Sequence, residues 1–155
     1  MLQESCKIVI DSSVKAAGTA LIPLSIVRVP ALTKITASMA KRIVTLYGYQ
    51  SLSGLTSFFS IVLGAATGVR IANEVLAHVP MLGTGAACIS TACLHLFTGG
   101  VLIGVCELIK AGNLSDSELQ DTKFCKVFCS RLIENASNIV FRTIRGLNPL
   151  ESAYV

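Results

Sequence analysis

The chain has 155 residues, of which 52% are hydrophobic and only 14% are charged, and its mean hydropathy is +0.68. Because an ordinary soluble domain carries about 25% charged residues, this composition excludes intrinsic disorder and argues against a freely soluble monomeric enzyme. The net charge of +4 is not concentrated in a basic cluster with interleaved aromatic residues, so we expect no nucleic-acid partner. The composition favours a membrane protein or a subunit buried in an assembly.

Apolar residues recur at helical spacing and rarely alternate with polar ones, which predicts an all-α bundle of about five or six helices. Residues 4–20 are predicted to form the first helix, which ends near Pro23. Pro30 is expected to be the first residue of the second helix, and Gly48 its C-terminal cap, because these residue types suit those positions. One apolar stripe defines this second helix: Leu32, Ile35, Met39, Ile43 and Leu46.

Two uncharged runs, residues 51–69 and 79–106, follow the second helix. Each approaches or exceeds the ~20 residues that a helix needs to cross the apolar core of a bilayer. They predict a central, Gly-rich helical hairpin over residues 51–106, with Arg70 and Glu74 in the interval between the runs. Buried core helices of a soluble bundle are the alternative.

Each apolar run contains a GxxxG pattern, Gly64 with Gly68 and Gly100 with Gly104. Small residues four positions apart allow two helix backbones to approach closely. We therefore predict that these four glycines are helix-packing residues and that the two runs pack on each other. Val62 and Ile103 are expected to face lipid instead.

Basic residues flank the hairpin on both sides, whereas the two charges in its connection cancel. Under the positive-inside rule, both ends of the hairpin are predicted to face the cytosol. A re-entrant hairpin that does not cross the membrane produces the same charge map. The flanking residues are Lys34, Lys41 and Arg42 before the hairpin and Lys110, Lys123 and Lys126 after it.

Ser115 and Glu118 have the spacing of a capping box, which predicts a last helix at about 116–145. Its apolar and basic residues separate onto opposite faces, so it could lie on a membrane surface, dock on a partner or form a bundle helix with a solvated face. The chain is thereby divided into an apolar, membrane-associated core (residues 1–112) and a C-terminal amphipathic basic helix with a short tail (residues 113–155).

No catalytic, cofactor-binding or metal-binding residue is predicted, and we do not expect an enzyme. His78 and His95 have no neighbour at ligand or triad spacing, and His95 is expected to be a hydrogen-bonded core histidine. No lysine follows Gly83 and Gly85 as a phosphate-binding Walker motif requires. The cysteines lack metal-site spacing and are expected to be small, buried and reduced: Cys6, Cys88, Cys93, Cys106, Cys125 and Cys129.

Two short segments carry a resemblance to a known family. The segment AKRIVTLYG at 40–48 precedes the Gly-rich run, and LAHVPMLG at 76–83 opens a small-residue helix that contains Ser90 and Thr91. Over roughly residues 15–110 this order resembles the YcjF-like domain of unknown function. The resemblance implies an all-helical, membrane-associated module and adds a GTPase bound in trans as a partner. The chain departs from the family by lacking its early Pro-x-Pro-x-x-Asp pattern.

The function that these observations favour is that of a non-catalytic, membrane-associated structural or adaptor module. Its partners would be membrane lipid and other proteins, or further copies of the chain. The alternatives are a small accessory subunit of a larger, organellar membrane complex and a soluble helical bundle buried by oligomerisation. A transporter fits poorly, because its core should hold ionisable side chains inside the apolar segments. Among Asp, Glu, Lys, Arg and His residues, only His95 lies within the two apolar runs.

Overall fold

The computed structural model describes residues 1–22, 25–62, 64 and 83–151. Every regular element within these residues is a helix, which confirms the predicted all-α bundle. The elements are α1 (Leu2–Thr19), α2 (Ser25–Tyr47), a helix at Ser53–Val62, α4 (Gly83–Lys110), the 3-10 turn η1 (Glu118–Gln120), α5 (Thr122–Glu134) and α6 (Ala136–Ile144).

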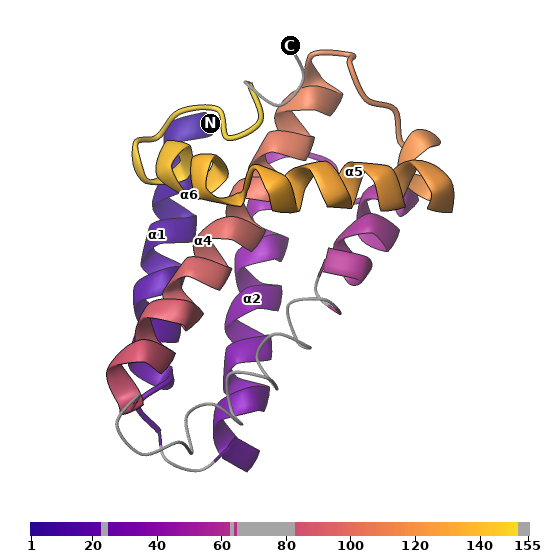
Figure 1. Cartoon of the computed structure of the whole chain (residues 1–155). Helices are drawn as coiled ribbons and strands as arrows, with labels where there is room; N and C mark the ends of the chain where they lie inside the picture. Colours follow the sequence, from indigo (N-terminus) through magenta and orange to yellow (C-terminus); the bar gives the residue numbers. More distant parts are fainter. Residues whose placement is uncertain (23–24, 63, 65–82, 152–155) are drawn as a thin grey trace.

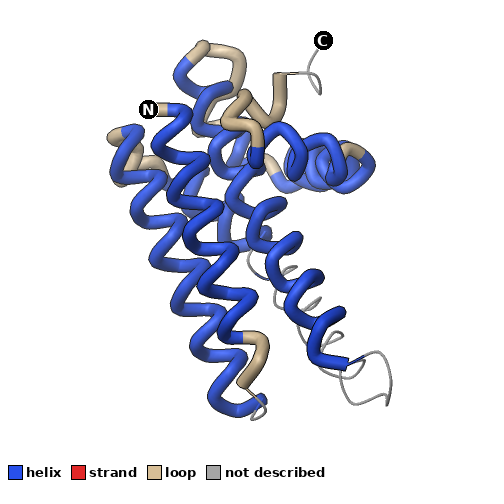
Figure 2. The backbone as a smooth tube through the Cα atoms, turned by 90° about the vertical axis from the view of Figure 1, so that its left-hand side faces the viewer, coloured by secondary structure: helices blue, strands red, loops and turns tan. Residues whose placement is uncertain are grey.

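The long helices α1, α2 and α4 run along the long axis of the molecule, and α5 crosses this direction (Figure 1). Helix α4 is central and packs most extensively on α1, then on α6 and α2. All residues from Thr98 to Cys106 are buried, so the C-terminal half of α4 forms the middle of the core. Figure 2 shows that α4 diverges from α1 and α2 toward its N-terminal end.

Helix α2 begins at Ser25, so the prediction that Pro30 opens it is wrong; Pro30 lies inside the helix. Proline at this position removes one backbone hydrogen bond. The first turn is anchored nonetheless by Arg28, whose buried guanidinium donates to the carbonyl of Ala20 at the end of α1, over 3.1 Å. This tertiary contact outweighs the local proline signal.

The other end of α2 follows the prediction. Gly48 adopts a positive φ of 76°, a conformation that favours glycine. The N–H of Tyr49 donates to the carbonyl of Val44 over 3.0 Å, and that of Gly48 to Thr45 over 3.1 Å. This pair of bonds is the Schellman pattern of a helix C-terminus.

The predicted capping box forms, because the Ser115 N–H donates to Glu118 Oε2 (2.8 Å) and the Glu118 N–H to Ser115 Oγ (3.3 Å). The continuous helix predicted at 116–145 is wrong, however: the chain breaks at Asp121 and Asn135. Asp121 has an extended backbone and accepts the N–H of Lys123 (2.8 Å), which makes it the N-cap of α5. Short polar side chains that bond to nearby backbone compete with helix continuation, which explains both breaks.

Candidate functional site

Two of the four predicted packing glycines lie against the C-terminal part of the chain. A Cβ atom added to Gly100 would stand 2.3 Å from Thr143 Oγ1 and 2.9 Å from Ile139 Cγ2, both on α6. A Cβ atom on Gly104 would stand 2.2 Å from Cγ of Leu150. These glycines therefore open the space on α4 in which α6 and Leu150 are packed.

The prediction that the two GxxxG patterns pack on each other does not hold for the described residues. Gly100 and Gly104 contact the C-terminal part, and a Cβ atom on Gly64 would meet no other atom within 4 Å. Gly68 lies outside the described residues. The small-residue pattern thus predicts close packing on α4 but not which element packs against these glycines.

Val62 and Ile103, expected to face lipid, are both buried, and Ile103 is completely so. The neighbouring Gly99 packs on α1, where a Cβ atom would lie 2.5 Å from Val9 Cγ2. Helix α4 is therefore enclosed on several sides at this level, by α1 and by the C-terminal part. A lipid-facing side does not exist at Ile103.

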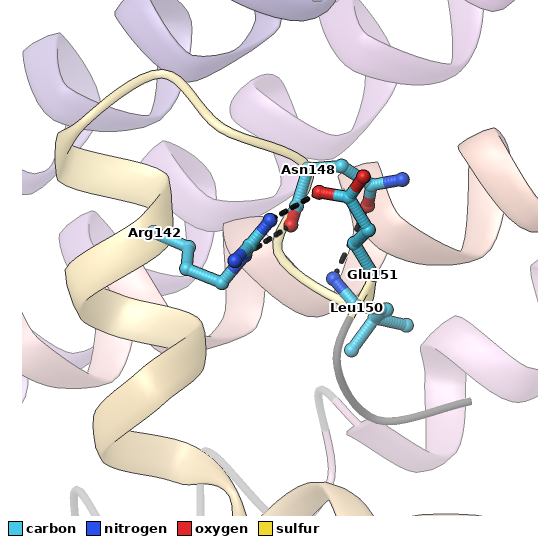
Figure 3. Close-up of polar contacts among 4 residues, drawn as sticks. All are labelled: Arg142, Asn148, Leu150 and Glu151. Atoms are coloured by element: carbon cyan, nitrogen blue, oxygen red, sulfur yellow. Dashed lines mark hydrogen bonds and ion pairs between the residues drawn. The ribbon is translucent and has the colours of Figure 1, made fainter. Parts of the chain in front are cut away.

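Polar contacts among Arg142, Asn148, Leu150 and Glu151 hold the turn after α6 (Figure 3). Arg142 Nε donates to the carbonyl of Asn148 over 2.7 Å, and the Arg142 guanidinium pairs with the Glu151 carboxylate. The Leu150 N–H donates to Asn148 Oδ1 over 3.2 Å. These contacts fix the turn that places the fully buried Leu150 side chain against α4.

His95 is completely buried, and both ring nitrogens are hydrogen-bonded. Nδ1 lies 2.9 Å from the Thr91 carbonyl, which requires a proton on Nδ1, and Nε2 lies 2.9 Å from the Thr36 hydroxyl on α2. The prediction of a hydrogen-bonded core histidine is confirmed. His78 lies outside the described residues.

A second buried polar pair joins α2 to the end of α4. The hydroxyl of Tyr47, a residue only 8% exposed, donates to the carboxylate of Glu107. Burial and, after it, this hydrogen bond raise the pKa of Tyr47 well above its ordinary value. The phenol therefore stays protonated and satisfies a partly buried carboxylate, which is a structural role.

Asp116 caps the Ser53–Val62 helix from a distant part of the chain. Its Oδ1 accepts the N–H of Leu55 over 3.0 Å, and Ser53 and Gln120 contact its Oδ2. Burial alone would raise the pKa of Asp116, but hydrogen bonds from Gly54, Leu55, Gln120 and Ser53 outweigh it and lower the pKa. No local pattern in the sequence indicates this cap, because its partners are 61 residues apart.

No group of three metal-ligating side chains occurs in the part of the chain that the structure describes. A groove of about 290 Å³ between α2 and the Ser53–Val62 helix has Lys41 as its one ionisable lining residue. All six cysteines are free thiols. The expectation that all of them are buried is wrong for Cys93, which is exposed, and for Cys88 and Cys129, which are partly buried. These described features provide no paired acid and base for general acid–base chemistry.

Among the described residues, one helix, Gly85–Lys110 within α4, is long and apolar enough to cross a membrane, a property that core helices of soluble bundles share. Comparison with known proteins identifies no relative. No family model, curated protein or solved structure matches the chain. The resemblance to the YcjF-like domain stays a prediction.

Proposed function

We propose that this chain is a non-catalytic, membrane-associated helical module with a structural or adaptor role. The observation that carries the proposal is the segregation of charge along the bundle. Exposed charged side chains lie on α5, on α6 and near Met1. At the opposite end of the bundle (Figures 1 and 2), the described residues 17–33 and 85–97 expose large apolar side chains and no charge. Contiguous exposed apolar surface on a small protein marks an interaction site.

We further propose that both ends of the 51–106 hairpin region face the cytosol. The contacts of Asp116 support this orientation, because it lies six positions after Lys110, the last residue of α4, and caps the Ser53–Val62 helix at Leu55. Both ends of the region are therefore close together at the charged end of the bundle. The excess of Lys and Arg there matches the cytosolic side of a membrane.

The outer face of α5 and α6 supports the adaptor part of the proposal. Val127, Ile133, Phe141 and Ile144 are each more than half exposed there. Exposed Lys123, Lys126, Arg131 and Arg145 lie among them in sequence, and the Arg145 guanidinium stacks over the Phe141 ring at 4.2 Å. Such a mixed basic and apolar face suits a protein partner with an acidic surface, and a GTPase in trans is the partner that the family resemblance adds.

Flotation with lipid vesicles tests the proposal, together with carbonate extraction of membranes from expressing cells. We expect the protein to float with vesicles that contain anionic lipid and to stay in the membrane pellet. A monodisperse protein that neither floats nor pellets would contradict membrane association and favour the soluble bundle. Flotation only in the presence of a co-purifying protein would favour the accessory-subunit alternative.

A further inference from the structure

The apolar end of the bundle has a composition unlike the rest of the chain. Between Ala16 and Thr33 the only charged residue is Arg28, and α4 carries no charge from Gly83 to Cys106. Large apolar side chains are nevertheless exposed at this end, which no other described element covers. They are Leu21 and Val27, each more than half exposed, Ile26 (88%) and Ile89 (68%).

Among the described residues at this end, the one charge points inward. Arg28 is 7% exposed, and its guanidinium donates to the Ala20 carbonyl, at the C-terminus of α1. A helix C-terminus carries partial negative charge and unpaired carbonyls, so both groups are satisfied within the protein. The part of this end that the structure describes therefore presents no formal charge on its outer surface.

Three hydroxyl groups at this end are also satisfied within their own helices. Thr19 donates to the Lys15 carbonyl (2.8 Å), Thr33 to the Val29 carbonyl (3.0 Å) and Ser90 to the Ala87 carbonyl (3.2 Å). Transfer of an unpaired hydroxyl from water to an apolar medium is costly, and these bonds reduce that cost. The end is therefore compatible with hydrocarbon.

Exposed lysines border the uncharged zone, Lys15 on α1 and Lys34 on α2. From Ser25 to Lys34 the helix rises about 14 Å at 1.5 Å per residue. One leaflet contributes about 15 Å of hydrocarbon, half of the bilayer core. Lysine ammonium groups at that height would reach the phosphates of an anionic surface.

The same geometry prevents α4 from crossing the bilayer in this conformation. Gly99 on α4 packs on Val9 of α1, and Val9 lies between the exposed Lys7 and Asp11. The outer surface at the level of Gly99 is therefore charged. Lipid that reached this level would have to surround exposed charges, which is unfavourable.

From these observations we infer that the uncharged end is a monotopic insertion surface. The C-terminal end of α1, the N-terminal end of α2 and the first turns of α4 enter the hydrocarbon of one leaflet, with Lys15 and Lys34 at the phosphates. The inference rests on the proposed membrane association and specifies its surface and depth. The occupant of this surface is a lipid leaflet and not a protein.

Because the chain contains no tryptophan, a single introduced tryptophan reports its own environment. Ile26→Trp and Ile89→Trp place it at the uncharged end, and Val127→Trp, at a residue 59% exposed on α5, is the matched control. The probe is a phosphatidylcholine vesicle with roughly one third phosphatidylserine, prepared with acyl chains brominated near their ends or near the headgroup. We expect blue-shifted emission and quenching by acyl-chain bromine for Ile26→Trp and Ile89→Trp only.

Aspartate at the same positions provides a second measurement. Ile26→Asp and Ile89→Asp should lower the vesicle partition coefficient about tenfold or more, because a carboxylate is costly in hydrocarbon. Val127→Asp should leave it unchanged. All three side chains are exposed, so equal thermal melts of the free proteins are expected and show that folding is intact.

The outcomes separate this inference from the proposed function. Vesicle flotation with quenching at Val127→Trp alone would overturn the insertion surface but retain membrane association. Absence of flotation for the unmodified chain would overturn both. If Ile26→Asp instead dissociates an oligomer in sedimentation without any vesicle binding, a second copy covers this end and the inference is wrong.

Discussion

Gly100 on α4 lies directly against Thr143 on α6, so that an added Cβ atom would stand 2.3 Å from the Thr143 hydroxyl oxygen. That hydroxyl already donates to the Ile139 carbonyl over 2.7 Å, and Thr143 is completely buried. The threonine therefore has little freedom to move aside. The missing side chain of Gly100 is what allows α6 to pack on the central helix.

We expect Gly100→Ala to destabilise the fold by about 1–3 kcal/mol, the usual cost of overpacking a core. Gly18→Ala is the control, because a Cβ atom at Gly18 in α1 meets nothing within 4 Å. That substitution should stabilise slightly, by up to about 1 kcal/mol, since alanine favours helix over glycine. Thermal or urea unfolding measures both. Equal stability of the two variants would contradict close packing at Gly100.

Gly104 and Leu150 are predicted to be energetically coupled. Leu150→Ala should cost about 2–5 kcal/mol, because it empties a fully buried site. Gly104→Ala displaces the same side chain, so the double variant should lose less stability than the two single variants together. A double-mutant cycle by urea unfolding measures this coupling. Strictly additive losses would show that Leu150 does not occupy the space above Gly104.

The sequence predicted what depends on neighbouring residues. Gly48 was identified as the cap of α2 and Ser115 with Glu118 as a capping box, because these signals lie within one helical turn. The sequence does not predict the interior position of Pro30, because Arg28 anchors the first turn through Ala20, a contact between two helices. A prediction from local helix propensity is wrong wherever a tertiary contact of this kind is stronger than that propensity.

The packing partners could not be predicted in the same way. The spacing of Gly100 and Gly104 predicts close packing, which the structure shows, but it contains no information about the facing element. Leu150 occupies that place because Arg142 binds Asn148 and Glu151, a set of contacts that depends on the turn after α6. The sequence likewise does not predict the cap that Asp116 provides for Leu55, since this bond joins two segments far apart in sequence.

Removal of the distant cap should weaken the attachment of the Ser53–Val62 helix. We expect Asp116→Ala to cost about 0.5–2 kcal/mol, as loss of a helix N-cap does. Asp116→Asn should cost less at neutral pH, because the amide oxygen still accepts the Leu55 N–H. Chemical denaturation at pH 7 measures both, and a smaller loss for alanine than for asparagine would contradict the capping role.

The lowered pKa of Asp116 gives this cap a pH dependence. Because the unfolded chain binds the proton more tightly, the stabilisation is complete above the ordinary pKa of 3.8 and is lost as the pH falls through the lower pKa of the folded state. Asp116→Asn removes this contribution. Its unfolding free energy should therefore fall less steeply than that of the unmodified chain in acid.

The Tyr47–Glu107 pair predicts a loss of stability in alkali, whereas the Asp116 cap predicts one in acid. Tyr47→Phe should destabilise the protein by about 1–3 kcal/mol at neutral pH, because it leaves the Glu107 carboxylate without this donor. Burial and the hydrogen bond raise the pKa of Tyr47 above its ordinary value of 10.0, so the folded chain retains the proton that the unfolded chain loses. The stabilisation is thus complete below pH 10 and decreases as the pH rises above it.

Urea unfolding between neutral and alkaline pH tests this sign. The unmodified chain should lose stability steeply above the ordinary tyrosine pKa, and Tyr47→Phe should show a shallower decrease. Tyr49→Phe is the matched control: Tyr49 is half-buried with its ring stacked on Tyr47 at a centroid distance of 6.1 Å, and its pKa is raised first by burial. Among the tyrosines that the structure describes, only Tyr47 combines burial with the hydrogen bond to Glu107. If the unfolding free energy of Tyr47→Phe falls with alkaline pH as steeply as that of Tyr49→Phe, groups other than Tyr47 cause the loss.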